Sequence, residues 1–348
     1  MYSFIQRCSV WLLFSSVLVM TGCQKEASVA NTPGAEETIA QILRDETRQF
    51  VVATATGGNT VTGNRNPQAG VPRDYPRAKF TFLTYALART GLMDDLARAG
   101  AYTLFAPTDD AFRHAGFQKL SDLNNVPEEM LTQILLYHVI AAKVSAAQVP
   151  AGPNAEVAML NAAKAYVTSK PGPAVYINGV SVIIADIMAV NGVIHVIDRI
   201  LFPPVGDLVQ TAVANPDFSF LVAAVLRASQ GNVNVAAVLS SAGPYTVFAP
   251  TNQAFRNAGF ASEAAIASAD PAALIPILTY HVIAGRIFSS DLTEGLQPAM
   301  LGGGTTLITL AGGPMIKGNL NATASSIIKT DIVATNGVVH VIDQVLRP

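Results

Sequence analysis

Asn-Gly-Val-Ile-His-Val-Ile-Asp occupies residues 191–198, and Asn-Gly-Val-Val-His-Val-Ile-Asp occupies residues 336–343. Asn-Gly is a strong signal for a type I′ turn, because both central positions of that turn need a positive φ. The residues that follow are β-branched and alternate with a period of two, which predicts the returning strand of a β-hairpin. Val193 and His195 should face one side of that strand and Ile194 the other.

The repetition extends well beyond this strand. Four blocks occur twice in the same order: Thr-Leu-Phe-Ala-Pro-Thr at 103–108 and Thr-Val-Phe-Ala-Pro-Thr at 246–251, Ala111-Phe112 and Ala254-Phe255, Tyr-His-Val-Ile at 137–140 and 280–283, and Asp186-Ile187 and Asp331-Ile332. The two copies are 143 to 145 residues apart. This period is far longer than the 20–50 residues of a solenoid unit, so we expect a duplicated domain in which each copy has its own core.

Composition sets the broad class of the protein. The chain has 348 residues, of which 50% are hydrophobic and 13% charged, enough for two ordinary domains. Its net charge is −2, and no cluster of Lys and Arg is visible, which argues against a nucleic-acid partner. The two cysteines are Cys8 and Cys23, so the rest of the chain has neither a disulfide nor a cysteine-based metal site.

Residues 1–23 have the pattern of a bacterial export signal. Arg7 precedes an apolar run at 10–20 that is too short to span a membrane. The run ends in Met-Thr-Gly-Cys at 20–23, which resembles a lipobox, and this resemblance implies that Cys23 is lipidated and becomes the new amino terminus. Several acyl chains would hold the protein durably at the cell envelope, at the outer membrane or the cell surface of a bacterium. The alternative is a short uncleaved anchor.

Residues 24–76 are interpreted as a tether or linker that holds one helix. Ile39, Ile42, Leu43 and Phe50 give a partial apolar stripe within residues 34–53. The residues after 53 are rich in Gly, Asn, Pro and Thr and show no apolar period. The tether has no visible counterpart in the second half of the chain, and it could be a spacer or a strap packed on the first copy.

Helices and strands within the copies follow from spacing and from turn residues. Helices are expected around 82–87, 128–136 and 220–225, and strands at 165–168, 174–177, 181–184, 305–310 and 326–329. Thr108 should cap a helix, with Asp109 and Asp110 in its first turn. The second copy has Asn252 and Gln253 at these places, so the two acids are interpreted as structural. Pro276 should kink or shorten its helix.

Taken together, the blocks resemble the fasciclin domain family. The resemblance covers residues 77–203 and 205–348 and implies an α+β fold with two tandem domains, each a β-wedge with packed helices. It also implies a surface-anchored, non-enzymatic adhesion protein that mediates cell–cell, matrix or polysaccharide attachment. Its partner would be a surface protein or a polysaccharide, with the membrane reached through the N-terminal lipid. Two alternatives are a structural envelope protein without a dedicated ligand and a histidine-based enzyme.

The resemblance also places candidate binding residues. In the family, binding to animal integrins is attributed to the Tyr-His region and to an Asp-Ile segment before the last hairpin. The matching positions here are Tyr137, His138, Asp186, Ile187, Met188, Tyr280, His281, Asp331 and Ile332. The second copy has Val333 in place of Met188, and the chain has no Arg-Gly-Asp tripeptide.

Each candidate also has a structural interpretation. His138, His195, His281 and His340 stand among aliphatic residues on strands, where a buried histidine usually hydrogen-bonds to the backbone. The tyrosines would pack inside, and the aspartates would accept hydrogen bonds from backbone amides. No esterase elbow, zinc-protease motif, P-loop or dinucleotide fingerprint occurs, so no cofactor, metal or catalytic residue is predicted.

Overall fold

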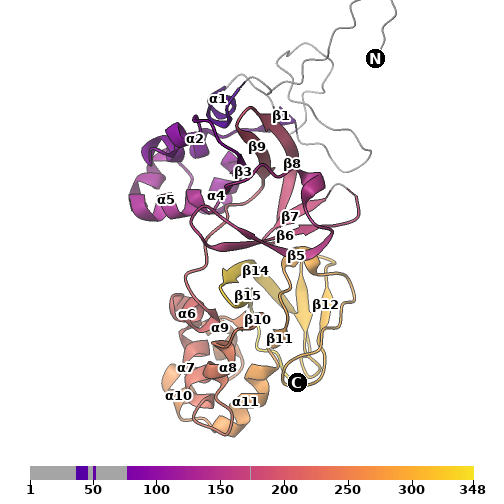
Figure 1. The fold of residues 1–348 in the computed structure, drawn as a ribbon. Coiled ribbons are helices and arrows are strands. Elements are labelled where there is room, and N and C mark those ends of the chain that lie inside the picture. Colours follow the sequence, from indigo (N-terminus) through magenta and orange to yellow (C-terminus); the bar gives the residue numbers. More distant parts are fainter. Residues whose placement is uncertain (1–36, 46–49, 52–76, 173) are drawn as a thin grey trace, which may run out of the picture. The chain divides into compact units, whose positions relative to one another are not determined.

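The structure is a computed structural model (Figure 1), and it describes residues 37–45, 50–51, 77–172 and 174–348. These residues form two successive copies of one α+β unit, which confirms the predicted fold class. Within each copy, the helices gather at one side and most of the strands at the other (Figure 1). The predicted export signal, with Cys23, lies outside the described residues.

The first copy contains a seven-stranded sheet with the order β4-β3-β9-β8-β7-β6-β5. Its strands are β3 (Tyr102–Pro107), β4 (Val139–Ile140), β5 (Gly152–Ala158), β6 (Lys164–Ser169), β7 (Val175–Ile177), β8 (Val180–Ala189) and β9 (Gly192–Ile197). Its helices are α1 (Ile39–Arg44), α2 (Thr81–Arg89), α3 (Leu92–Asp95), α4 (Asp109–His114) and α5 (Glu128–Leu136), with 3-10 turns η1 (Leu120–Asn125) and η2 (Ala146–Gln148). A separate pair, β1 (Phe50–Val51) and β2 (Arg77–Ala78), is antiparallel.

The second copy repeats this plan in a six-stranded sheet with the order β11-β10-β15-β14-β13-β12. Its strands are β10 (Tyr245–Pro250), β11 (Val282–Ala284), β12 (Leu307–Thr309), β13 (Met315–Lys317), β14 (Ser325–Ala334) and β15 (Gly337–Ile342). Its helices are α6 (Leu208–Val213), α7 (Ser219–Ala228), α8 (Val235–Leu239), α9 (Asn252–Asn257), α10 (Glu263–Ala267) and α11 (Pro271–Thr279), with 3-10 turns η3 (Pro216–Phe218) and η4 (Ser289–Asp291).

The repeated Asn-Gly strand is central to each sheet. In the first copy, β9 pairs antiparallel with β8 and parallel with β3, and every residue of β9 is buried. Ile194 and Val196 join the core under the helices, whereas Ile197 joins a second core between the strands. The predicted hairpin and the predicted alternation are therefore confirmed, and both faces of the strand are covered because each faces its own core.

The expected type I′ turn is wrong. Ala189 pairs with Gly192, so the turn residues are Val190 and Asn191, and neither Asn191 nor Gly192 has a positive φ. The pair is required by packing instead. A Cβ on Gly192 would lie 2.3 Å from the carbonyl oxygen of Tyr102, so only glycine allows the two strands to come this close.

The Asn191 side chain joins three segments of the first copy. Its Oδ1 accepts a hydrogen bond from the amide of Ile39 at 2.9 Å, and its Nδ2 donates to the carbonyls of Leu96 and Arg98 at 2.8 Å. These partners lie more than 90 positions away along the chain. Asn191 therefore holds the start of α1 against the hairpin, a role that no local turn rule predicts.

Helix α1 has a counterpart, although the sequence showed none. The amide of Leu208 at the start of α6 donates to Oδ1 of Asn336 at 2.9 Å, just as Ile39 donates to Asn191. Ile39 and Ile42 have no exposed surface and belong to the first core. A strap packed on the first copy therefore describes residues 39–44 better than a spacer does, and we propose that the first domain includes α1.

Helix termini follow local chemistry with one exception. Thr108 caps α4, because its Oγ1 accepts from the amide of Ala111 at 3.2 Å, and α5 has the predicted bounds. The predicted shortening at Pro276 does not occur, since α11 continues to Thr279. Pro276 removes one hydrogen bond to the carbonyl of Ala272, and Ala272 is exposed, so water can solvate that carbonyl.

Candidate functional site

The two candidate tyrosines are completely buried at the ends of α5 and α11. The hydroxyl of Tyr137 donates to the carbonyl of Lys164 at 2.7 Å and accepts from Nδ2 of Asn178 at 3.0 Å. Burial raises the pKa of the Tyr137 phenol, because the phenolate would lose its hydration. Tyr280 makes the matching bond to the carbonyl of Thr305 at 2.5 Å. Neither ring is available to a macromolecular partner at the surface.

His138 and His281 are also buried, and they connect a helix end to the end of their copy. Nδ1 of His138 donates to the carbonyl of Ile134 at 2.7 Å, and its Nε2 accepts from the amide of Leu201 at 3.0 Å. Nδ1 of His281 lies 2.8 Å from the carbonyl of Ile277, and its Nε2 accepts from an amide in the last residues of the chain. Burial lowers the pKa of both imidazoles to about 4. Both rings are neutral at pH 7, and neither has a free nitrogen.

His195 and His340 lie on the central strands, and the roles of their two ring nitrogens are reversed: Nε2 donates to a carbonyl and Nδ1 accepts from an amide. Nε2 of His195 donates to the carbonyl of Val144 at 2.9 Å, and its Nδ1 accepts from the amide of Asp186 at 3.2 Å. His340 makes the matching bonds, with its Nδ1 accepting from the amide of Asp331 at 3.3 Å. Burial lowers the pKa of His195. All four repeated rings thus hydrogen-bond to the backbone, and none is arranged to bind a substrate or a metal.

Asp186 and Asp331 sit at matching irregularities of β8 and β14. Their φ values are +59° and +64°, a conformation that Asp tolerates better than most residues, and each lies where the strand register shifts. Oδ1 of Asp186 accepts from the amide of Ala146 at 2.8 Å, and Oδ1 of Asp331 accepts from the amide of Ser289 at 2.7 Å. The carboxylates therefore do bond backbone amides, but amides about 40 residues away.

Exposure divides the candidates sharply. Ile187 is buried, whereas Asp186 is exposed and Met188 is 38% exposed. Val190, the first residue of the turn after β8, is 55% exposed and is not among the predicted residues. We call Asp186, Met188 and Val190 the Asp186 face. Asp186 and Met188 are the two predicted residues of the first copy that are accessible from solvent.

The second copy does not present the same surface. Asp331 and Ile332 are half-buried, and Val333, which replaces Met188, is buried. A long, flexible side chain therefore stands exposed in one copy where a short, buried one stands in the other. The two copies share a fold and the hydrogen bonds of these side chains to the backbone, but they differ in the exposure of residues 186–188 and 331–333.

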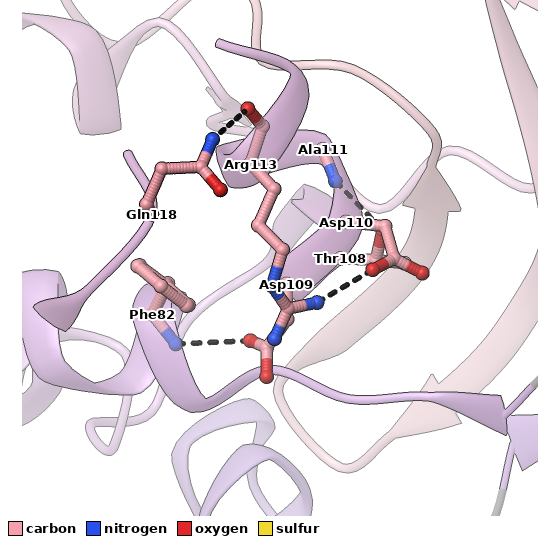
Figure 2. Close-up of polar contacts among 7 residues, drawn as sticks. All are labelled: Phe82, Thr108, Asp109, Asp110, Ala111, Arg113 and Gln118. Carbon is pink, nitrogen blue, oxygen red and sulfur yellow. Dashed lines mark hydrogen bonds and ion pairs between the residues drawn. The ribbon is translucent and has the colours of Figure 1, made fainter. Parts of the chain in front are cut away.

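The acids of the Thr108 segment have structural roles, as the sequence predicted. Figure 2 shows Oδ1 of Asp109 accepting from the amide of Phe82 at 3.0 Å, while Asp110 pairs with Arg113 at 2.5 Å. Asn252 replaces Asp109 in the second copy and accepts from the matching amide at 2.9 Å. This position requires an oxygen that accepts a hydrogen bond but does not require a charge. Its side chain pairs with an amide in the first turn of α2 or α7, which has no partner within the helix.

Two general observations concern the described residues alone. Among them, no three His, Cys, Asp or Glu side chains are close enough together to hold a metal ion. None of their helices has the length and apolar character needed to cross a membrane.

The chain is similar to proteins that contain fasciclin domains. The model of the fasciclin domain matches residues 78–203 and 216–348. The chain is 30% identical over 258 residues to transforming growth factor-beta-induced protein ig-h3 of Sus scrofa, which covers 74% of this chain and 36% of that protein. It is 36% identical over 142 residues to protein sll1483 of Synechocystis sp., covering 40% of this chain and 73% of that one.

A solved FAS1 domain pair from the insect cell adhesion molecule fasciclin I is also similar. It shares 20% identity with this chain, with a TM-score of 0.37, and the match covers 77% of this chain and 96% of that one. The chain spans about a third of the length of the ig-h3 protein.

Proposed function

The chain belongs to the fasciclin domain family, and from this premise we propose that it is a non-enzymatic attachment protein that binds a surface partner through the Asp186 face of its first copy. The observation that carries the proposal is the exposure of Asp186 and Met188, next to candidate residues that are buried. Tyr137 and His138 are buried and bonded within the first copy, so they do not touch the partner. His195 supports the face, because its Nδ1 accepts from the amide of Asp186.

The chemistry of the face favours a protein partner. Met188 and Val190 offer an adaptable thioether and a branched aliphatic group, and Asp186 adds a carboxylate beside them. Methionine adapts to irregular apolar surfaces, and interface cores combine such apolar anchors with a polar rim. A partner with a small apolar patch next to a basic side chain would complement this arrangement.

Bead attachment tests the proposed face. Beads that carry the protein should adhere to the producing bacterium, and Met188→Lys should weaken attachment by about tenfold or more if Met188 is an anchor residue. Thr335→Lys is the control for an added surface charge, because Thr335 is exposed in the turn after β14 of the second copy, where the first copy has Val190. Asp186 is left unchanged, since its side chain and its φ are part of the fold.

Circular dichroism must show that both variants are folded. Folded Met188→Lys protein that attaches as well as wild type would refute the role of the face. Equal losses in the two variants would indicate a general effect of added charge and would also count against it. If the wild type attaches to nothing, a structural envelope protein becomes the better interpretation.

We also propose that a lipid on Cys23 anchors the protein in the cell envelope of a bacterium. The support is the sequence Met-Thr-Gly-Cys at 20–23 after an apolar run, which lies outside the described residues. Cys23→Ser should move the protein from the membrane fraction to the soluble fraction. Cys8→Ser is the matched control and should leave the fractionation unchanged. Membrane retention of Cys23→Ser would contradict the anchor.

A further inference from the structure

A cavity of about 90 Å³ lies inside the second copy, between the helices and the central strands. Its wall includes Ala212 from α6, Val247 from β10 and Val339 from β15. The one polar side chain in the wall is His281, and both of its ring nitrogens already bond to the backbone. The wall therefore offers a ligand no hydrogen bond, and a polar group that entered it would lose its hydration without compensation.

Comparison of the two copies explains why the space exists. The first copy carries a larger side chain at four of the wall positions: Leu43 in place of Ala212, Leu87 in place of Val225, Leu104 in place of Val247, and Ile194 in place of Val339. All four larger side chains are buried in the first core. The first copy is smaller at two wall positions, with Ala40 in place of Val209 and Ala88 in place of the exposed Leu226. Protein interiors are normally close-packed, so the loss of several methyl and methylene groups from one wall leaves a void unless the helices collapse.

The cavity also opens to solvent. Val213 and Leu226 belong to its wall, yet they are 63% and 56% exposed. At the place of Val213 the first copy has Arg44, which pairs with Asp94 at 3.7 Å. A polar rim in one copy is thus replaced by an apolar entrance in the other, and the entrance lies between α6 and α7.

We propose that this cavity binds the methyl end of the alkyl chain of a free, single-chain amphiphile. Benzene, which has six carbons, fills an apolar cavity of about 150 Å³, so by proportion a cavity of about 90 Å³ takes about three carbons. The apolar entrance formed by Val213 and Leu226 covers the next part of a longer chain. An engineered apolar cavity of about 150 Å³ in another protein binds benzene and xenon, so a dry apolar cavity of this order can hold a ligand.

The size of the cavity also favours a free amphiphile over a membrane lipid as the source of the bound alkyl chain. Each buried methylene changes an equilibrium constant by about fourfold. A membrane lipid would have to withdraw many methylene groups from the bilayer to place about three in the cavity, so a bilayer should not give up its lipids to this site. A free amphiphile gains burial for the carbons that enter.

Titration with linear alcohols tests the proposal. The protein carries Cys23→Ser, so that no covalent acyl chain competes, and 1-propanol, 1-butanol, 1-pentanol and 1-hexanol are added in turn. Methyl NMR signals of Ala212 and Val339 should shift and saturate, and the affinity should increase by about fourfold per carbon until the cavity and its entrance are full. Signals of Leu43 and Ile194 in the first copy are the internal control and should not saturate.

Two variants fill the space with the side chains of the first copy. Ala212→Leu should weaken 1-hexanol binding by at least about tenfold, because the added side chain occupies the volume of the ligand. Val339→Ile, made separately, should weaken it by about fourfold for the same reason. Val339→Ile is the milder change and keeps the test valid if Ala212→Leu does not fold. Ala264→Leu adds the same side chain as the first variant at an exposed position of α10 and should bind like wild type.

Three results would overturn the proposal: no saturable shift in wild type, no dependence on chain length, or unchanged binding in the folded filling variants. Vesicles of phosphatidylglycerol serve as the second arm of the test. Shifts of Ala212 and Val339 with vesicles but not with 1-hexanol would show that the source is a bilayer lipid and would refute the proposed free amphiphile.

Discussion

Acid should destabilise this protein through His138 and His281. Burial lowers the pKa of each imidazole from 6.5 in the unfolded chain to about 4 in the folded chain, so the unfolded chain takes up a proton at a higher pH. The stability is therefore fully present above pH 6.5, and it decreases as the pH falls from 6.5 toward 4. At about pH 5 the difference in proton binding corresponds to roughly 2 kcal/mol for each histidine.

Urea unfolding followed by far-UV circular dichroism measures this effect at about pH 7.5 and about pH 5. His138 and His281 should each remove roughly 2 kcal/mol of the wild-type unfolding free energy between the two conditions, and His195, whose pKa burial also lowers, adds to the loss in the first copy. His281→Gln, which cannot titrate, should be less stable at the higher pH but should lose the pH dependence of the second copy. His114→Gln is the control for replacing a histidine by glutamine, because His114 is exposed at the end of α4.

The comparison between the variants isolates the contribution of the imidazoles to the pH dependence, because all three proteins have the same carboxylates. Equal unfolding free energies of the wild type at the two pH values would refute the reasoning. So would a His281→Gln protein with the full pH dependence of the wild type, because the proton would then bind elsewhere. Separate transitions for the two copies would sharpen the test, with only the second one altered by the variant.

Three further predictions concern the fold. Gly192→Ala should lower the free energy of unfolding by about 1–3 kcal/mol or more, measured by calorimetry, because its Cβ would clash with the carbonyl of Tyr102. Asp109→Asn should keep the wild-type stability, as Asn252 serves in the second copy, whereas Asp109→Ala should cost about 1–3 kcal/mol in urea unfolding by leaving a buried amide unpaired. Tyr137→Phe should cost a similar amount and leave bead attachment unchanged; a loss of attachment by the folded variant would contradict its buried position.

Local patterns predicted much of the secondary structure. The alternation of β9, the bounds of α5 and the Thr108 cap depend on neighbours within a few residues, so the sequence contains all the information that they need. The duplication was visible for the same reason, since both copies repeat the residues that fix these local features. The Asn191-Gly192 turn was misjudged because its residues are chosen for contacts with distant segments.

The resemblance to the fasciclin family proposes candidate residues, but it does not predict their exposure. A motif marks Tyr137 and Asp186 equally, and only the packing of strands and helices shows that one is buried and the other faces solvent. Met188 and Val333 occupy matching positions after Asp-Ile, yet Met188 is exposed whereas Val333 packs with Phe288 and Val338.

The sequence alone determined that two α+β copies form, because periodicity, caps and turn residues act over short distances. The tertiary structure alone decided which repeated side chains reach the surface, that α1 completes the first core, and that a cavity remains in the second copy. These properties depend on how volumes from distant segments fit together. Smaller side chains at several distant positions produce a cavity only because the fold brings those positions together around one space.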